Sequence, residues 1–509
     1  METKTAAIEM RNITKRFGPV LANDKVWLNI YRGEILALLG ENGSGKTTLM
    51  NMLSGIYFPD EGEIKIDGKE VVIRSPKDAF DNGIGMIHQH FKLVDVLTAA
   101  ENIVLGLPGK LDLKAASAKI REICDKYGFS VDPAQKIYDM SVSQKQTVEI
   151  VKVLYRGADI LILDEPTAVL TPQETDKLFA VLRNMRNDGK AIVIITHKMH
   201  EVEALSDRVA ILRHGQFIGD MLTAHTNAQE MTNMMVGHAV SLNIERPDPV
   251  DPKPRIEVKG LTVRSVDGIV KLDDVSFTAN SGEILGIAGI SGCGQKELLE
   301  AIAGLQTVES GSISYIEDDG SREELIGKDP LSIAELGVSL SFVPEDRLGM
   351  GLVGNMNLAD NMMLRSFRRG KSIFTDRRSP RALAESVVQE LSVSTPSVDT
   401  PVRRPSGGNV QRVLVGREIA SAPTVLLTAY AVRGLDIHSS YTIYDLINRQ
   451  KKAGVAVIFV GEDLDVLLEL CDRILVLCGG KVSGIVSGRG AEKREVGMMM
   501  TKLGGQSNE

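Results

Sequence analysis

The sequence predicts an α/β fold in which one domain occurs twice, each copy built on a mostly parallel sheet. The segment from Arg32 to Gly55 returns 249 positions later (281 − 32), as Ser281 to Gly304. The segment from Ala204 to Leu212 returns 265 positions later (469 − 204). Short apolar runs alternate with stretches at helical spacing, which is typical of buried parallel strands joined by helices. A repeat of this length indicates two copies of one domain, so it is the first guide to the domain organisation.

Length and composition set broad limits. With 509 residues, 43% of them hydrophobic and 25% charged, the chain is too long for one small domain and has an average globular composition. The net charge of −8 argues against a broad nucleic-acid-binding surface. Four cysteines without a CxxC pair fit a reducing compartment. No run approaches the ~20 apolar residues needed to span a bilayer, so we expect any membrane connection to run through partners.

The domain boundaries follow from the repeat and from a proline-rich segment between the copies. We expect copy one over residues 1–240, a linker over 241–255 and copy two over 256–505. The linker contains four prolines between Asn243 and Arg255, which interrupt helices and central strands. The change of offset from 249 to 265 means that copy two carries 16 extra residues (265 − 249), expected in loops or a peripheral subdomain.

A glycine-rich loop follows the apolar run Ile35 to Leu39 in copy one. It matches GxxxxGK[ST] between a predicted strand and a predicted helix. Glycines let the backbone wrap a phosphate, the helix N-terminus directs N–H groups at it, Lys46 neutralises its charge and Thr47 can ligate Mg²⁺. The nucleotide-binding residues predicted here are Gly40, Glu41, Asn42, Gly43, Ser44, Gly45, Lys46, Thr47 and Thr48.

Two adjacent carboxylates, Asp164 and Glu165, end the apolar run that starts at Ile160. Acids at a strand end beside a phosphate loop suit a metal contact, for Asp164, and a base for an attacking water, for Glu165. Taken alone, an apolar strand that ends in two acids is more often a strand that simply meets solvent. The neighbouring motifs give the assignment its weight.

With these motifs in place, the chain resembles the ATP-binding subunit of an ABC transporter over essentially its full length. The resemblance implies two tandem P-loop NTPase domains, each with a helical subdomain, that use ATP and Mg²⁺. It places Phe17 at the aromatic that stacks on adenine, Gln89 at a glutamine that contacts Mg²⁺, and His197 at the histidine that contacts the γ-phosphate. The implied catalytic residues are Lys46, Glu165 and His197, and the implied metal contacts are Thr47, Gln89 and Asp164.

The two copies depart from the family pattern in complementary ways. In copy one, the signature sequence, usually LSGGQ, reads Met140 to Gln144, and Ser143 replaces a glycine that lets the backbone approach a phosphate. Thr171 replaces the usual D-loop aspartate. Copy two keeps that aspartate as Asp436 and keeps the signature residues Ser406, Gly407, Gly408 and Asn409. Its other motifs are altered: Gln295 replaces Lys46, Lys296 replaces Thr47, Ala429 replaces Asp164, Tyr430 replaces Glu165, Glu462 replaces His197, Glu345 replaces Gln89 and Val266 replaces Phe17.

In the ABC family two nucleotide domains sandwich ATP head to tail, so each site joins the loop of one domain to the signature of the other. The resemblance therefore implies one competent composite site, made from the copy-one motifs and the copy-two signature, and one degenerate site. Independent decay of scattered motifs would not be expected to leave one whole site intact. This distribution predicts an intramolecular sandwich.

Tandem copies with a degenerate second half resemble the bacterial importer ATPases for simple sugars and for purine nucleosides. In the segment Gly85 to Gly106, Gln89 is followed by His and Phe, which is closer to the nucleoside type. We expect a subunit that powers nucleoside import, with simple sugars of the ribose, galactose or xylose type as the alternative. The implied partners are two membrane permease subunits and a solute-binding lipoprotein. The implied location is peripheral, on the cytoplasmic face of the bacterial cell membrane.

Two further classes of function stay open on the sequence alone. Soluble twin-cassette ATPases act on ribosomes or nucleic acid, but they usually keep both sites competent and join them by a long charged helix. The chain could also be a regulatory protein without ATPase activity. Phosphate release by the purified protein, with and without membrane subunits, would separate that last class from the others.

Overall fold

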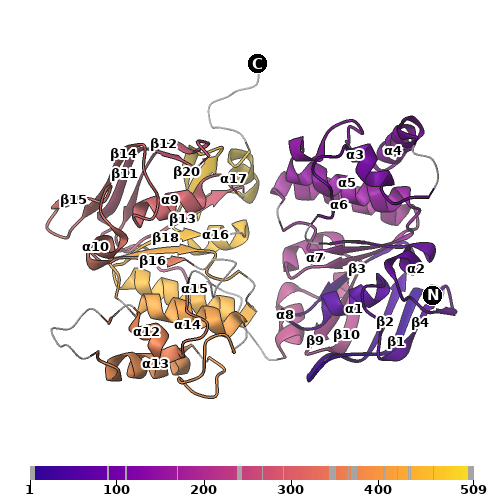
Figure 1. Ribbon diagram of the computed structural model, residues 1–509, viewed down its shortest axis with the longest axis horizontal. Helices are drawn as coiled ribbons and strands as arrows, with labels where there is room; N and C mark the ends of the chain where they lie inside the picture. Colours follow the sequence, from indigo (N-terminus) through magenta and orange to yellow (C-terminus); the bar gives the residue numbers. More distant parts are fainter. Residues whose placement is uncertain are drawn as a thin grey trace. The chain divides into compact units, whose positions relative to one another are not determined.

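The computed structural model describes residues 6–501, apart from 89–90, 109–111, 169, 238–243, 266, 291, 343–350, 365, 368–374, 392, 405–406, 421, 434, 436 and 462. The chain divides into two compact units, unit 1 (Met1–Ser241) and unit 2 (Leu242–Glu509). Each unit combines a six-stranded sheet, a four-stranded sheet and a set of helices (Figure 1). This is the mostly parallel α/β architecture that the sequence predicts, in two copies.

The six-stranded sheet of unit 1 carries the predicted apolar strands at its centre. Neighbouring strands are parallel except for the pair formed by β9 and β10. In β8 alternate side chains enter two different core clusters, Val193 and Ile195 on one face and Ile192 and Ile194 on the other. Both faces are therefore covered, as parallel sheets require. The strand order is β10 (Gln216–Leu222), β9 (Arg208–Arg213), β3 (Glu34–Leu39), β8 (Ala191–Ile195), β7 (Ile160–Asp164) and β6 (Ile84–Ile87).

An antiparallel sheet, which the sequence analysis does not anticipate, completes each unit. In unit 1 its alternating strands place Ile8, Met10 and Leu28 in the same core cluster as Leu49 of helix α1. The sheet thus covers the helix that follows the glycine-rich loop. Its order is β2 (Val20–Tyr31), β1 (Ala6–Phe17), β4 (Glu61–Ile66) and β5 (Lys69–Val71), and α1 spans Lys46–Leu53.

A helical subdomain of unit 1 has its own core, in which Ile103, Ile120 and Val148 pack together. Its third helix, α5, begins at the altered signature. Ser141 caps that helix by accepting a hydrogen bond from the backbone N–H of Gln144, whose side chain bonds back to Ser141. The helices of unit 1 are α1, α2 (Pro76–Asp81), α3 (Ala99–Val104), α4 (Leu113–Tyr127), α5 (Val142–Tyr155), α6 (Pro172–Asn187), α7 (Met199–Leu205) and α8 (Ala228–Val236).

Unit 2 repeats this plan. The strand orders are β16 (Val338–Phe342), β17 (Val425–Ala429), β18 (Ala456–Val460), β13 (Ile284–Gly289), β19 (Arg473–Cys478) and β20 (Lys481–Ser487), and β12 (Val270–Asn280), β11 (Pro254–Arg264), β14 (Ser310–Ile316) and β15 (Arg322–Glu324). The helices described in unit 2 are α9 (Gln295–Ile302), α10 (Pro330–Glu335), α12 (Leu358–Met363), α13 (Arg378–Glu390), α14 (Gly407–Ile419), α15 (Ile437–Lys452), α16 (Leu464–Leu470) and α17 (Lys493–Met499).

Most of the proline-rich segment packs against unit 2. The guanidinium of Arg246 donates to the carbonyl of Leu468 at 2.9 Å, and Asp248 pairs with Arg489 at 2.6 Å. Pro254 is the first residue of β11, a position where a strand tolerates proline because the missing N–H lies outside the ladder. Side chains of the segment, Arg246 and Asp248, therefore attach it to the rest of unit 2, which follows it in the chain.

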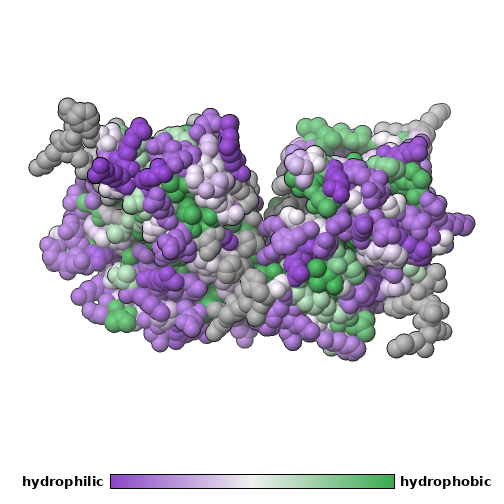
Figure 2. All heavy atoms as spheres, turned by 90° about the horizontal axis from the view of Figure 1, so that it is seen from below, coloured by the Kyte–Doolittle hydropathy of each residue, from purple (hydrophilic) through white to green (hydrophobic). Residues whose placement is uncertain are grey.

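Among the described residues, no helix combines the length and the apolar character needed to cross a membrane. The face drawn in Figure 2 is mostly hydrophilic, and its hydrophobic residues form small separate patches.

Candidate functional site

The glycine-rich loop of unit 1 joins β3 to α1 in a shape that requires glycine at two positions. Gly45 has φ +95°, and a Cβ there would lie 2.3 Å from the backbone oxygen of Ala22. At Gly40 a Cβ would lie 2.3 Å from the carbonyl oxygen of Leu212. These contacts are far shorter than van der Waals distance, so side chains at either position would displace the loop. The sequence motif thus reflects a backbone that is packed from both sides.

Lys46 lies at the centre of this loop and is only 8% exposed. Its Nζ donates to the carbonyl oxygens of Gly40 at 2.6 Å and Glu41 at 2.9 Å. Burial lowers the pKa of Lys46 to about 8, although the carboxylates of Glu165, Asp164 and Glu41 act in the opposite direction. A cation held at the loop centre is placed to bind a phosphate there.

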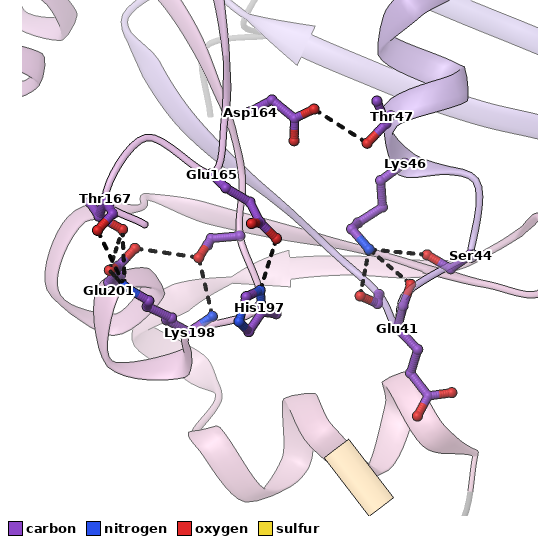
Figure 3. Close-up of polar contacts among 12 residues, drawn as sticks. Glu41, Ser44, Lys46, Thr47, Asp164, Glu165, Thr167, His197, Lys198 and Glu201 are labelled. Atoms are coloured by element: carbon purple, nitrogen blue, oxygen red, sulfur yellow. Dashed lines mark hydrogen bonds and ion pairs between the residues drawn. The ribbon is translucent and has the colours of Figure 1, made fainter. Parts of the chain in front are cut away.

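Thr47 and Asp164 bring two oxygen atoms together beside the loop. Thr47 Oγ1 lies 3.4 Å from Asp164 Oδ2 (Figure 3). Burial, followed by the like charge of Glu165, raises the pKa of Asp164 to about 6. A hydroxyl and a carboxylate are the oxygen ligands that Mg²⁺ accepts, and a divalent cation would favour the ionised form of Asp164. The residues present therefore fit a magnesium ion bound together with nucleotide phosphates.

Glu165 and His197 form a second polar pair, one residue beyond the metal-type ligands. Glu165 leaves β7 with φ +46°, held by its N–H, which donates to the carbonyl of Ile195 at 2.9 Å. His197 Nδ1 lies 3.0 Å from Glu165 Oε1. This hydrogen bond lowers the pKa of Glu165 and outweighs the opposing effect of burial. The carboxylate is therefore ionised at neutral pH and available to accept a proton.

The aromatic residue Phe17 lies at the end of β1 and is 41% exposed. Its ring meets that of Tyr57 edge to face, with centroids 5.1 Å apart and an interplanar angle of 71°. Lys15 Nζ lies 5.6 Å from the centroid of the Phe17 ring. The contact with Tyr57 fixes the Phe17 ring, and its exposure leaves aromatic surface on which a nucleotide base can stack.

Unit 2 reproduces this backbone without its chemistry. Gln295 is buried at the position of Lys46, and its side-chain amide donates to the carbonyl of Ile290 at 3.1 Å. Lys296 pairs with Glu300 on its own helix, at 3.6 Å. Tyr430 takes the place of Glu165 with φ +54°, and its N–H donates to Val460 at 2.9 Å. Together with Ala429, these residues supply no carboxylate at the end of β17.

The two signature segments carry different side chains at the start of helices α5 and α14, as their sequences indicate. In unit 1 the hydroxyl of Ser143 lies 3.0 Å from that of Ser141, and Thr171 caps helix α6 through a capping box with Glu174. In unit 2 helix α14 begins at Gly407, and the side chain of Asn409 accepts the N–H of Ser394 at 2.9 Å. Several predicted residues lie outside the described ones: Gln89, Val266, Glu345, Ser406, Asp436 and Glu462.

The structure adds polar residues that the sequence analysis does not single out. Asn23 is fully buried beneath the loop and donates to the carbonyl of Gly45 at 3.2 Å. Gln146 of α5 donates to the carbonyl of Pro166 at 2.5 Å, in the turn after Glu165. Asn23 aligns with Leu272 at the 249 offset, so comparison of the two copies could have revealed it.

A phosphate loop, an oxygen pair for a divalent metal and a carboxylate–histidine pair at the ends of parallel strands define a P-loop nucleotide-binding protein. The sequence profile of the ABC transporter family matches residues 23–168 and 272–428. The chain belongs to this ABC transporter family, and it is an ATPase coupled to transport.

The relatives match over nearly the whole chain. The nucleoside import ATP-binding protein NupA of Lactococcus lactis is 42% identical over 99% of both chains. The guanosine import ATP-binding protein NupO of Bacillus subtilis is 40% identical over 97% of both chains. The glucose import ATP-binding protein TsgD13 of Haloferax volcanii is 39% identical over 98% of this chain and 96% of its own. A crystal structure of a nucleotide-free ATP-binding cassette is 25% identical, with a TM-score of 0.40, and covers 45% of this chain and 95% of its own.

Proposed function

We propose that the chain is the ATP-hydrolysing subunit of an importer, that its solutes are nucleosides, and that it acts at the cytoplasmic face of the membrane. The observation that carries the proposal is the joint presence in unit 1 of Lys46 in the phosphate loop, the Thr47–Asp164 oxygen pair and the Glu165–His197 pair. Two relatives named for nucleoside or guanosine import, each 40% identical or more, support the choice of solute. Membership of a transporter family favours this role over action on ribosomes or nucleic acid.

The mechanism follows from the positions of the side chains in unit 1. Lys46 and the N-terminus of α1 bind the β- and γ-phosphates, and Phe17 stacks on the adenine ring. Glu165 accepts a proton from the attacking water, and His197 orients both Glu165 and the γ-phosphate. Thr47 and Asp164 would hold Mg²⁺, which when bound offsets charge on the phosphates. Gln89, which lies outside the described residues, is proposed as a further metal contact.

One competent site and one degenerate site make up the proposed catalytic arrangement. The signature residues Ser406, Gly407, Gly408 and Asn409 would complete the site of unit 1, a pairing that rests on the sequence pattern of intact and altered motifs alone. Unit 2 has no lysine at the position of Lys46 and no carboxylate at the positions of Asp164 and Glu165, which argues that it does not hydrolyse ATP. ATP would favour the closed form by binding it more tightly than the open form. A difference of about 5.5 kcal/mol between these two binding free energies converts a 1:99 ratio of closed to open molecules into 99:1.

The proposed partners are two permease subunits and a solute-binding lipoprotein. In unit 1 two large side chains are strongly exposed, Val96 at 68% and Tyr138 at 61%. The N–H of Tyr138 donates to the carbonyl of Asp95 at 3.1 Å, so the two side chains lie on neighbouring segments. Apolar side chains grouped on a charged protein mark contact surfaces, and a permease is the occupant that this family implies.

The test of hydrolysis is the substitution Glu165→Gln. Loss of the proton acceptor should lower the rate of phosphate release by ~10²- to 10⁴-fold while ATP binding persists. Binding is measured with a fluorescent ATP analogue and turnover by phosphate release, on the full-length chain and on its complex with the permeases. Activity within a few-fold of the unmodified protein would overturn the assignment of Glu165.

A second candidate solute is a simple sugar. The relatives named for glucose and ribose import, at 39% and 38% identity, favour it almost as strongly as the nucleoside relatives favour nucleosides. Co-purification of the permeases and the binding lipoprotein, followed by titration with nucleosides, pentoses and hexoses, decides between the two. A lipoprotein that binds sugars but no nucleosides would reverse the preference stated above.

A further inference from the structure

A buried carboxylate is hydrogen-bonded to residues that lie close in sequence to Glu165 and His197. Glu201, in the first turn of α7, is 4% exposed. Its Oε1 accepts the hydroxyl of Thr167 at 2.5 Å and its Oε2 accepts the hydroxyl of Thr196 at 3.3 Å. Lys198 Nζ pairs with Oε1 at 3.2 Å. We refer to Thr167, Thr196, Lys198 and Glu201 as the anchor cluster. Figure 3 labels three of its members, Thr167, Lys198 and Glu201, beside Glu165 and His197.

The anchor cluster joins the two loops that carry the catalytic pair. Thr167 lies two residues after Glu165, and Thr196 and Lys198 flank His197 on both sides. The backbone N–H of Lys198 also donates to the hydroxyl of Thr196, at 3.1 Å. One carboxylate is thus bonded to the loop of the general base and to the loop of the histidine. A change in either bond would alter the relative position of Glu165 and His197.

Unit 2 shows that the fold does not require these polar contacts. At the 265 offset the four positions hold Val432, Gly461, Asp463 and Val466. Both valines pack against the main core cluster of unit 2. The turn after β17 nevertheless keeps its backbone hydrogen bond, and α16 has the same seven-residue length as α7. A valine pair therefore builds the same turn in the unit that lacks the catalytic residues.

We propose that Glu201 is a positioning residue for ATP hydrolysis, which through Thr167 and Thr196 sets the geometry of the Glu165–His197 pair. The inference rests on the proposed roles of that pair. The polar cluster occurs in the unit with the proposed catalytic carboxylates. In the other unit valines stand at the positions of Thr167 and Glu201, with glycine in place of Thr196 and aspartate in place of Lys198. Misplacement of a catalytic group by about 1 Å can lower a rate ~100-fold, so a buried anchor of this kind controls turnover rather than binding.

The experiment transplants the valine pair of unit 2 into unit 1. The double variant Thr167→Val, Glu201→Val is compared with the unmodified full-length chain for kcat, KM for ATP and thermal unfolding. We expect kcat to fall about 10- to 100-fold while KM stays within about threefold, because the phosphate loop is untouched. Thr167→Ser, which keeps the hydroxyl, should retain most of the activity.

The matched control is Thr223→Val, which removes another buried hydroxyl of unit 1. Thr223 Oγ1 lies 2.8 Å from Ser206 Oγ, at the C-terminal end of α7. Its kcat should equal that of the unmodified chain. If the double variant does not accumulate as folded protein, the single variant Thr167→Val, which leaves the Glu201 carboxylate paired with Lys198, supplies the same measurement of kcat and KM.

The positioning role is overturned if the double variant, or Thr167→Val where the double variant does not fold, keeps kcat within twofold of the unmodified chain. It is also overturned if KM rises as much as kcat falls, or if Thr223→Val or Thr167→Ser loses as much activity as the double variant. Glu165→Gln is measured in parallel. If Glu165→Gln stays active, the proposed catalytic pair is wrong. If it is inactive while the double variant is active, only the role of the anchor cluster is wrong.

Discussion

The ends of strands β7 and β17 offer two versions of one structure. Glu165 and Tyr430 both have positive φ, +46° and +54°, and both N–H groups donate to the neighbouring strand at 2.9 Å. A non-glycine residue in this region costs of order 1–3 kcal/mol. Because Tyr430 keeps the strained conformation without a carboxylate, the strain belongs to the turn that leaves the strand. The chemistry depends on the side chain that the turn presents.

The two glycine-rich loops support the same separation of backbone from chemistry. Gly45 and Gly294 have φ values of +95° and +99°. Lys46 and Gln295 are both buried and both donate to the carbonyl at the same loop position, Glu41 and Ile290. Unit 2 therefore retains the shape of a phosphate loop and has lost the positive charge at its centre.

The largest effect on ATP binding is expected from exchanging that central residue. Lys46→Gln gives unit 1 the residue of unit 2, and it should lower ATP affinity ~10- to 100-fold, because charge-assisted hydrogen bonds to phosphate contribute about 1.5–3 kcal/mol. Hydrolysis should fall with it. The affinity is measured by calorimetric titration with a non-hydrolysable ATP analogue, and turnover by phosphate release.

The reciprocal change, Gln295→Lys, serves as the control. It restores a cation to unit 2 but not the carboxylates, which Ala429 and Tyr430 replace. Phosphate release in a Glu165→Gln background should therefore remain at the level of that background. If adding Gln295→Lys to the Glu165→Gln chain raised phosphate release, the missing loop charge would be the sole defect of unit 2. That result would contradict the comparison drawn above.

The sequence predicted the strands and the loop that carry a recognisable local pattern of residues. The all-apolar runs at Ile35, Ile160 and Ala191 correspond to β3, β7 and β8, because strands buried on both faces leave an uninterrupted pattern. The repeat also predicted that both units share one fold. The phosphate loop was predictable since its glycines are set by backbone contacts that any such loop must make.

The antiparallel sheets and the anchor cluster could not be predicted in the same way. β1 contains register shifts in its pairing with β2, and these interrupt the alternation of apolar and polar residues that signals a strand. Thr167 and Glu201 are 34 residues apart and meet only through the tertiary fold. A buried glutamate on a short helix carries no local signal. The contrast with Val432 and Val466 was visible in the sequence, but its meaning required the hydrogen bonds.

A smaller effect is expected from adding one methyl group at glycines of the two loops. Gly43 and Gly45 both have positive φ, but a Cβ at Gly43 meets nothing within 4 Å, whereas one at Gly45 overlaps backbone. Gly43→Ala should cost about 1–2 kcal/mol, and Gly45→Ala about 1–3 kcal/mol more. Calorimetric unfolding measures both.

The equivalent pair in unit 2 sharpens this comparison. Gly292 is open and Gly294 is crowded, since a Cβ there would lie 2.5 Å from Leu272 Cδ2 and 2.6 Å from the carbonyl oxygen of Lys271. Gly294→Ala should destabilise the chain as Gly45→Ala does. Only Gly45→Ala should also weaken binding of the ATP analogue. Equal loss of binding from both variants would contradict the assignment of the competent loop to unit 1.

The smallest effect concerns pH and the carboxylate that only unit 1 possesses. Burial and the charge of Glu165 hold the pKa of Asp164 at about 6, so the group is protonated below that pH and cannot ligate Mg²⁺ well. The Mg²⁺ concentration needed for half-maximal binding of an ATP analogue should rise up to ~10-fold per pH unit below about pH 6. Binding of the analogue without Mg²⁺ corrects for protonation of the analogue itself. Because Glu165 raises this pKa, Glu165→Gln should move the midpoint to lower pH, and an unmoved midpoint would show that Asp164 does not set it.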